Sequence, residues 1–333
     1  MRSSEQRWGT SSRAMAFDDI IGHERQKRFL NFLMERGNIP HAFLFCGQEG
    51  IGKRQMAMEF TKRLFCQAGT ACGACRSCVR LDRGSHPDLV IIRNEGSIGI
   101  DDSRMIAKEV SEHPFEQDRR VIIIDNAETM TNEAANALLK TLEEPPPYNH
   151  FFVITSSERE IPLTIRSRCA RVAFSPLSRE QLELYFRDRA GIDPGRAGLL
   201  ASISFGSIGS GLFWLDEDNF SLRVRIAEAL SGRTKGFVLA SSLAEKASMT
   251  DRSASMYLAF LLSFFRDLFV RKVAGGTSLI TNTDLEDVFD GASADLTWIE
   301  NSLKRVQETV RVMRYNVNRW LVFENLLIHV ARE

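Results

Sequence analysis

Residues 41–53 read HAFLFCGQEGIGK, and this stretch decides the fold of the first half of the chain. The run His41–Cys46 is apolar enough for a buried strand, and the apolar spacing of Lys53–Phe65 predicts an amphipathic helix. The loop between them matches G-x-x-x-x-G-K, the pattern of a phosphate-binding P-loop. Its members are Gly47, Gly50, Gly52 and Lys53. Glycines let backbone N–H groups turn toward phosphate oxygens, and the lysine adds a positive charge. A plain glycine-rich turn is the alternative, which the strand, loop and helix order disfavours.

The residue after the P-loop lysine departs from a working nucleotide site. A working P-loop continues with Ser or Thr, whose hydroxyl binds magnesium, whereas this chain has Arg54. The sequence leaves open whether the loop is empty, holds ADP or binds ATP without cutting it. The bulk and second charge of Arg54 favour weak or no binding.

A second apolar run ends in a carboxylate. Residues 121–125 read VIIID, which predicts a strand over Val121–Ile124 with Asp125 at its carboxyl end. Ligands of open α/β sheets bind at this edge, so Asp125 is a candidate for the shell of a nucleotide-bound magnesium. Asn126 follows. Because an amide does not accept a proton as a carboxylate does, we interpret it as a polar residue that ends the strand.

Apolar runs recur through the first half of the chain with helical patterns between them, which is typical of a parallel sheet with crossover helices. The expected strands are His41–Cys46, Leu89–Ile92, Val121–Ile124, Phe151–Thr155 and Arg171–Phe174. A further helix is expected over Glu133–Leu142, where three prolines follow closely. The fold class of this half is therefore α/β.

After Pro176 the strand signals stop, and the rest of the chain is expected to be helical. A helix is predicted over Arg179–Ala190, and Gly206, Gly209 and Gly211 are expected to mark a loop. Near the C-terminus apolar residues recur at spacings of three and four, which predicts one long helix with a single apolar face. These residues are Leu303, Val306, Val310, Met313, Val317 and Leu321.

The cysteines form a second chemical pattern. Four of the six lie within residues 66–78, at Cys66, Cys72, Cys75 and Cys78. Two overlapping C-x-x-C spacings and one further cysteine match a tetrahedral zinc site, and the density of thiols disfavours a set of free surface cysteines. Cys46 and Cys169 are expected to pack as small apolar residues. His86 is expected to shape the turn before the second strand rather than to replace a sulfur ligand.

An arginine precedes the last expected strand. Residues 165–171 read IRSRCAR, with Arg168 between a serine and a cysteine. Arginine is suited to reaching a phosphate across an interface, because its charged fork donates two parallel hydrogen bonds. A surface ion pair is the ordinary alternative for such an arginine.

Charge and hydropathy limit the function classes. Lys plus Arg and Asp plus Glu both number 43, so the chain has no basic excess for binding DNA phosphates by itself. Residues 1–14 are polar and lack the apolar segment of a secretory signal, so we expect a disordered extension, with Met1 or Met15 as the start. The most apolar run, Met256–Phe265, is followed by charges and is too short to span a bilayer. We therefore expect a cytoplasmic protein without a membrane segment.

Together these motifs resemble those of the bacterial clamp-loader subunits of the AAA+ class. The resemblance is dense from Phe17 to about Phe174. Besides the P-loop, the cysteines and residues 167–169, it rests on three runs: FDDIIG at 17–22, HAFLF at 41–45 and NALLKTLEEPP at 136–146. The cysteine cluster after the P-loop helix and the run at 136–146 are specific in combination.

The resemblance implies a domain plan and partners. Residues 15–175 would form an AAA+ nucleotide-binding-type domain with a zinc insert at 66–78, residues 176–235 a helical lid, and residues 236–333 a helical collar for oligomerisation. The implied partners are gamma/tau and delta subunits in a hetero-pentamer, and through them the sliding clamp and primed DNA. Zinc is the implied structural cofactor, while ATP or ADP stays open.

Three positions depart from the hydrolysing members of the family. Arg54 stands at the magnesium position, and Asn126 stands where the family has the Glu that polarises the attacking water. Gly209, after GSI at 206–208, stands where an arginine reads the γ-phosphate. Thr155 keeps a hydroxyl at the other sensor position. Loss of a general base alone lowers a rate by about 10²–10⁴.

This pattern resembles the delta-prime type, a stator of the DNA polymerase III holoenzyme, which is a DNA-directed DNA polymerase complex. Such a subunit has no intrinsic ATPase activity and keeps Arg168 as an arginine finger that acts in trans on a neighbouring ATPase. The first alternative is a hydrolysing gamma/tau-like subunit with unusual motif residues. The second is a nucleotide-dependent AAA+ protein outside replication.

Overall fold

A computed structural model describes residues 20–330 of the chain, except residues 95, 232–236, 276–278, 293–294, 314 and 316. The chain divides into two compact units, Met1–Leu177 and Ser178–Glu333. The extension expected over residues 1–14, the start at Met15 and the run at 17–19 lie outside the described residues. So does the expected boundary between residues 235 and 236.

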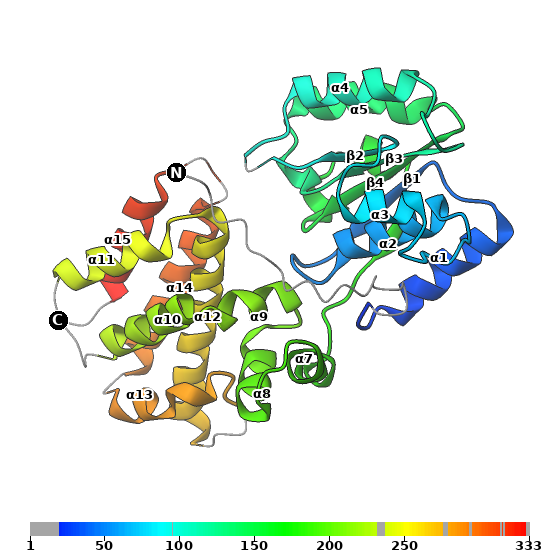
Figure 1. Ribbon diagram of the computed structural model, residues 1–333. Helices are drawn as coiled ribbons and strands as arrows, with labels where there is room; N and C mark the ends of the chain where they lie inside the picture. Colours follow the sequence, from blue (N-terminus) through cyan, green and yellow to red (C-terminus); the bar gives the residue numbers. More distant parts are fainter. Residues whose placement is uncertain are drawn as a thin grey trace. The chain divides into compact units, whose positions relative to one another are not determined.

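A five-stranded parallel sheet forms the centre of the N-terminal unit (Figure 1), with the strand order β2-β3-β4-β1-β5. The strands are β1 (Ala42–Cys46), β2 (Leu89–Ile92), β3 (Arg120–Ile124), β4 (Asn149–Thr155) and β5 (Ala170–Ala173). The five predicted strands are all present, with ends that differ by one or two residues at most. The prediction of an α/β fold with a parallel sheet is confirmed.

Helices cover both faces of this sheet, with α1, α2 and α3 on one side and α4 and α5 on the other (Figure 1). Their bounds are α1 (Glu24–Arg36), α2 (Lys53–Phe65), α3 (Arg76–Asp82), α4 (Ile100–Ser111), α5 (Asn132–Glu143) and α6 (Leu163–Arg166), with 3-10 turns at Ala127–Thr129 and Glu158–Glu160. The two helices predicted from the sequence correspond to α2 and α5.

The alternation of side chains along β1 explains the two layers. Phe43 and Phe45 point to the side of α2, where they pack with Phe60, whereas Leu44 packs on the other side with Leu138 of α5. All five residues of β1 are buried. A strand covered on both faces needs an unbroken apolar run, which is what residues 42–46 supply.

The C-terminal unit is helical throughout its described part (Figure 1). Its helices are α7 (Arg179–Leu184), α8 (Pro194–Ile203), α9 (Ile208–Leu215), α10 (Glu217–Leu230), α11 (Phe237–Ala247), α12 (Asp251–Ala274), α13 (Glu286–Gly291), α14 (Leu296–Val312) and α15 (Arg319–Val330). A π-helical turn over Tyr185–Arg189 prolongs α7, so the helix predicted to run to Ala190 is present. Within the unit, α11 packs against α15 and α12 against α14.

The loop expected at three glycines is only partly present. Gly206 lies in a turn with a φ of 84°, but Gly209 and Gly211 lie inside α9. A side chain at Gly211 would approach the ring of Phe186 to 2.1 Å. This glycine therefore permits close packing of a helix rather than a turn, and the loop prediction is wrong for Gly209 and Gly211.

The single long C-terminal helix is also wrong. The chain forms two helices instead, because α14 ends at Val312 and α15 begins at Arg319. Asn318 explains the new start, since its side-chain oxygen accepts the backbone N–H of Leu321 at 3.2 Å, the bond of an N-cap. Leu321, expected on the apolar face, is 51% exposed.

Helix α12 has 24 residues and is long and apolar enough to cross a membrane by length and composition alone. However, 61% of its apolar window is buried inside the fold, as in the core helix of a helical domain. Residues such as Tyr257, Phe264 and Phe265 are fully buried along it. We therefore interpret α12 as a core helix.

A buried ion pair connects α10 to the segment before α13. Arg223 is fully buried, and its guanidinium donates to both carboxylate oxygens of Asp284 at 2.6 and 3.0 Å. It also donates to the side-chain oxygen of Asn282 at 2.7 Å. These three bonds offset part of the cost of burying the charge, so they hold the segment in place.

We predict that Arg223→Ala lowers the unfolding free energy of the C-terminal unit by about 3–5 kcal/mol, because it leaves the partner groups of a buried ion pair unpaired. Urea unfolding followed by circular dichroism measures this change. Arg225→Ala, on the exposed face of the same helix, is the matched control. Equal shifts for the two variants would show that the buried ion pair does not stabilise this unit.

Candidate functional site

The P-loop connects β1 to α2 and has the backbone conformation of a tight glycine turn. Gly47, Gly50 and Gly52 have φ angles of 154°, 74° and 100°. A side chain at Gly47 would approach the carbonyl oxygen of Phe174 to 2.4 Å, since the loop passes close to the residue after β5. Glycine is therefore required at this position for both conformation and space.

Lys53 closes the loop on itself. Its ammonium group donates to the carbonyl oxygens of Gly47 and Gln48 at 2.6 and 2.7 Å, and the side chain is buried. Burial lowers the pKa of Lys53, and the nearby carboxylates of Glu128 and Asp125 act in the opposite direction. A phosphate bound in this loop has to compete with the two carbonyl oxygens for the lysine.

Asp125 lies at the carboxyl end of β3 between two arginines. Its Oδ2 atom is 3.9 Å from Nε of Arg54 and 3.8 Å from Nε of Arg93. The predicted magnesium carboxylate thus lies beside Arg54, the residue that directly follows the P-loop lysine. Two positive charges beside one carboxylate oppose the approach of a divalent cation.

Sequence reasoning did not find Arg93. The available signal was its place directly after β2, because β2 and β3 are parallel neighbours and their carboxyl ends meet at one edge.

The residues after β3 and β4 complete this edge. Asn126 adopts a left-handed conformation with a φ of 57° and begins a 3-10 turn. Glu128, in that turn, accepts hydrogen bonds from the backbone N–H of Ser156 at 3.0 Å and from the Ser156 hydroxyl. The hydroxyl of Thr155 is buried and accepts the backbone N–H of Ser157 at 3.0 Å. Glu128 was not singled out from the sequence, although it is the carboxylate nearest after Asp125.

Gly209 lies in the C-terminal unit, in the first turn of α9. Its carbonyl oxygen accepts a hydrogen bond from Nη2 of Arg252 at 2.9 Å. Glycine offers no side chain at this position, where the sequence resemblance led us to look for an arginine.

The four clustered cysteines come together in space. The four sulfur atoms, of Cys66, Cys72, Cys75 and Cys78, all lie within 4.8 Å of one another. A tetrahedral zinc with bonds of about 2.3 Å separates its sulfurs by about 3.8 Å, so the cluster has the size of such a site. Four sulfur donors are the set that zinc prefers in structural sites. The cluster is consistent with the predicted structural zinc.

Backbone groups favour the thiolate form of two of these cysteines. Burial opposes ionisation of Cys66, but N–H groups led by that of Cys72, 3.4 Å from the sulfur, lower its pKa to about 6. The backbone N–H of Cys78 is the main cause that lowers the pKa of Cys75. Burial raises the pKa of the Cys78 thiol. Zinc binds thiolates, so the N–H groups around Cys66 and Cys75 suit a metal ligand.

The cysteine cluster is attached to the P-loop helix. Cys66 is the C-cap residue directly after α2, and Lys62 in the last turn of α2 bonds Asp82 of α3 at 2.5 Å. One helix therefore begins at the P-loop lysine and ends directly before the first cysteine of the cluster.

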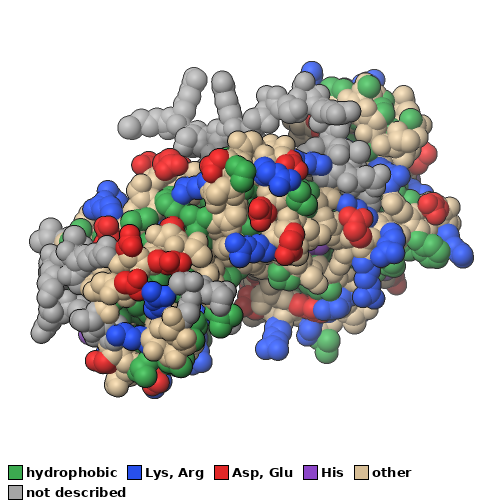
Figure 2. Space-filling view, turned by 90° about the horizontal axis from the view of Figure 1, so that it is seen from below, with side chains coloured by type: hydrophobic (Ala, Val, Ile, Leu, Met, Phe, Trp, Pro, Cys, Tyr) green, Lys and Arg blue, Asp and Glu red, His purple; other side chains and the backbone are tan. Residues whose placement is uncertain are grey.

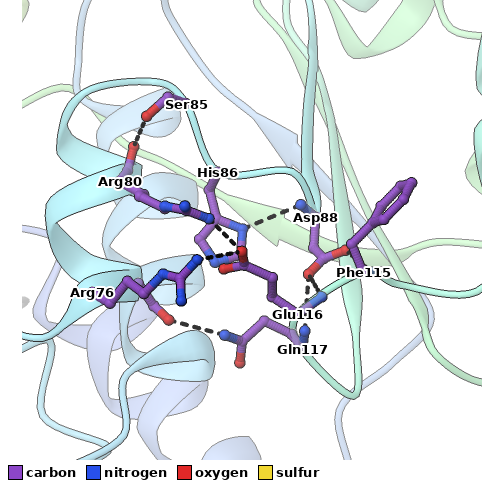
Figure 3. Close-up of polar contacts among 9 residues, drawn as sticks. Arg76, Arg80, Ser85, His86, Asp88, Phe115, Glu116 and Gln117 are labelled. Atoms are coloured by element: carbon purple, nitrogen blue, oxygen red, sulfur yellow. Dashed lines mark hydrogen bonds and ion pairs between the residues drawn. The ribbon is translucent and has the colours of Figure 1, made fainter.

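Polar contacts attach the other side of the insert to the loop before β3 (Figure 3). Asp88 is fully buried and accepts the backbone N–H groups of residues 115–117 at 2.6–2.9 Å. Arg76 and Arg80 of α3 both bind the carboxylate of Glu116, the first at 3.1 Å. The insert is thus held at α2 and at this loop.

The remaining predicted side chains behave as structural residues. His86 accepts the backbone N–H of Asp88 on Nδ1 at 3.1 Å, which shapes the turn into β2, and it is not among the four clustered ligands. Cys46 is buried at 4% exposure and Cys169 packs against the sheet. This placement agrees with the apolar packing expected of both residues, and burial raises the pKa of Cys169 to about 12.

Arg168 follows α6 and is held on two sides. Nη1 donates to the carbonyl oxygen of Thr164 at 2.8 Å, and Nη2 donates to the carboxylate of Glu143 at 2.7 Å. The side chain is 33% exposed. Glu143 belongs to the run at 136–146 that carries the family resemblance, so the two motifs meet in the folded chain.

Comparison with known proteins identifies the family. Residues 22–178 match the family described as DNA polymerase III, delta subunit. The chain is 35% identical over 188 residues to the DNA polymerase III subunit delta' of Bacillus subtilis, which covers 55% of this chain and 57% of that protein. It is 29% identical over 259 residues to the subunit delta' of Escherichia coli, with 75% of each chain covered.

The chain belongs to the clamp-loader subunits of DNA polymerase III related to delta-prime and gamma/tau. It is also 29% identical over 317 residues to the subunit tau of Bacillus subtilis, which covers 87% of this chain and 55% of tau. The match thus spans about half the length of both Bacillus subtilis relatives. Similarity to both kinds of clamp-loader subunit leaves the choice between them to the site residues.

In this clamp-loader subunit the predicted nucleotide residues gather at one edge of the sheet. The P-loop follows β1, Asp125 follows β3, and Thr155 ends β4, and these three strands are neighbours in the sheet. Arg168 lies apart from this group, beside the end of α5. Its contact with Glu143 is the surface ion pair that sequence reasoning gave as the alternative.

We predict that freshly purified, reduced protein carries one zinc per chain, bound by the four clustered cysteines. Replacement of Cys66 and Cys78 by serine removes the metal and lowers the melting temperature, because an insert of this size has no core of its own. Elemental analysis and thermal unfolding measure the two effects.

Cys169→Ser is the matched control and should leave the zinc content unchanged. Less than about half an equivalent of zinc in the reduced wild-type protein would contradict the assignment.

Proposed function

We propose that this chain is a delta-prime-like stator of the DNA polymerase III clamp loader. It takes part in loading the sliding clamp onto primed DNA, does not hydrolyse ATP itself, and supplies Arg168 to ATP held by a neighbouring gamma/tau-type subunit. The observation that carries the proposal is the pairing of Arg54 with Asp125 at the position of a magnesium shell. A P-loop with an arginine beside its candidate metal carboxylate keeps the fold of a motor without its chemistry.

Phosphoryl transfer has three separate requirements. Magnesium neutralises the charge on the phosphates, a carboxylate positions the attacking water, and a sensor arginine reads the γ-phosphate. Arg54, Asn126 and Gly209 stand at these positions and meet none of the three requirements. Since loss of one general base lowers a rate by about 10²–10⁴, the three departures together leave no measurable turnover.

A hydrolysing gamma/tau-like subunit is the second candidate. The match to tau over 87% of this chain favours it, and so does the carboxylate of Glu128, which faces the same lysine as Asp125. In this reading the Glu128 carboxylate substitutes for the missing one at Asn126. The hydrogen bonds from Ser156 to Glu128 disfavour it, because they already occupy one of the carboxylate oxygens.

The remaining parts of the proposal concern assembly. Residues 176–235 act as the helical lid and residues 236–333 as the collar, which joins gamma/tau and delta subunits in the cytoplasm. Acidic and basic side chains are intermingled on the face drawn in Figure 2, in keeping with the equal numbers of the two charges. Contact with primed DNA and with the sliding clamp is therefore made within the complex.

We predict that the isolated protein does not hydrolyse ATP. The double variant Arg54→Thr with Asn126→Glu recovers magnesium-dependent nucleotide binding without full turnover, because Gly209 still leaves the sensor position without an arginine. Phosphate release and equilibrium binding of a fluorescent ATP analogue measure the two properties. Steady turnover by the wild-type protein that Lys53→Ala abolishes would contradict the stator proposal and support the gamma/tau-like alternative.

We predict that Arg168→Ala lowers clamp-dependent ATP turnover and clamp loading in the reconstituted complex, while folding, zinc content and assembly are retained. An arginine that stabilises charge on the γ-phosphoryl group of a neighbour is worth about 10³–10⁵ in rate at that one site. The total turnover falls less than this, because the complex has other nucleotide sites. Arg168→Lys rescues poorly, since a point charge does not reproduce the bidentate fork.

Arg171→Ala is the matched control for this prediction, because it removes another exposed arginine with a carboxylate partner, Glu158. Normal assembly and wild-type loading by Arg168→Ala would return Arg168 to the role of a surface ion-pair partner.

A further inference from the structure

The carboxylate that holds Arg168 occupies an unfavourable place on its own helix. Glu143 is the last residue of α5, and a negative charge there faces the negative end of the helix dipole. Glu144 follows, so a second negative charge lies beside it. Helix stability therefore does not explain an acidic residue at position 143, whereas the bond to Arg168 gives it a counter-charge.

The bonds to Arg168 leave its guanidinium able to bind an anion. An arginine has five N–H donors, and the contacts to Thr164 and Glu143 use two of them. Within the described part of the chain, the other three N–H groups are available to an anion. A long side chain loses rotamer freedom when it is fixed, and here the two contacts fix it before a phosphate arrives. The arrangement thus holds the charged fork in one orientation while part of it stays exposed.

We propose that Glu143 is a positioning residue for Arg168, an inference that rests on the proposed action of Arg168 on a neighbouring nucleotide. The carboxylate and the Thr164 carbonyl oxygen keep the guanidinium in one orientation, with a third of the side chain exposed. Because α5 begins after the turn that follows Asp125, the finger is anchored to a helix that starts at the nucleotide edge of the same subunit. Glu143 does not touch the nucleotide itself and acts only through Arg168.

The opposite role would be a latch, in which Glu143 competes with the phosphate for Arg168. Substitution by glutamine separates the two roles, because Gln keeps an oxygen that accepts from Nη2 but removes the charge. A positioning residue tolerates Gln and not Ala. A latch is released by both.

The test uses the complex reconstituted with gamma/tau-type and delta subunits, the sliding clamp and primed DNA. The quantity of interest is the part of clamp-dependent ATP turnover that Arg168→Ala removes. We expect Glu143→Ala to lower the kcat of this part by about threefold to tenfold, with KM nearly unchanged, in line with a partly exposed ion pair. Glu143→Gln should restore it to about half of wild type or more. Glu144→Ala, the adjacent exposed glutamate, is the matched control and should have no effect.

The double variant Glu143→Ala with Arg168→Ala should behave as Arg168→Ala alone, since Glu143 acts only through the arginine. If Arg168→Ala itself has no effect, the proposed function fails. If Arg168→Ala lowers turnover but Glu143→Ala does not, or if Ala and Gln at position 143 both raise turnover, only the positioning role is overturned. Loss of assembly with both Glu143 variants would also overturn it, because Glu143 would then be an interface residue.

Discussion

The parallel pairing of β3, β4 and β1 is the constraint on which the site depends. Parallel neighbours bring the carboxyl ends of their strands to one edge, where the P-loop, Asp125 and Thr155 meet although they are far apart in the sequence. The strand pairing forms this edge whether or not the site binds or hydrolyses a nucleotide. It brings position 54 close to Asp125, so the arginine at that position forms an ion pair with the carboxylate.

Two helices extend from this edge to the other functional parts of the unit. Helix α2 carries the P-loop at its start and the first cysteine of the cluster at its end, and α5 runs from the turn after Asp125 to the glutamate that binds Arg168. In a hydrolysing subunit, such helices would connect nucleotide chemistry to the surface. In this chain Lys53 bonds the carbonyl oxygen of Gly47 and Arg54 lies beside Asp125 at this edge, while Arg168 is paired with Glu143 at the far end of α5.

The sequence predicts the N-terminal unit better than the C-terminal one, for physical reasons. A strand buried on both faces needs a short unbroken apolar run, and such runs place β1–β5 closely. Helix boundaries in an all-helical unit depend on caps and on single close contacts. Asn318 begins a new helix within one apolar pattern, and Gly211 sits inside a helix to make room for Phe186. The roles of Arg93 and Glu143 were not predicted, because each depends on an ion pair with a residue distant in the sequence, Asp125 and Arg168 respectively.

The central claim is that Arg168 of this subunit contacts ATP bound by a neighbouring subunit, and that this chain's own P-loop does not hydrolyse ATP. Electron cryomicroscopy of the reconstituted clamp loader with a non-hydrolysable ATP analogue tests it most directly. The account predicts Arg168 at hydrogen-bond distance from a γ-phosphate held by the adjacent subunit, with Arg54 still paired to Asp125. A magnesium nucleotide coordinated by Asp125 in this chain's own P-loop, with Arg168 turned away from any phosphate, would contradict it.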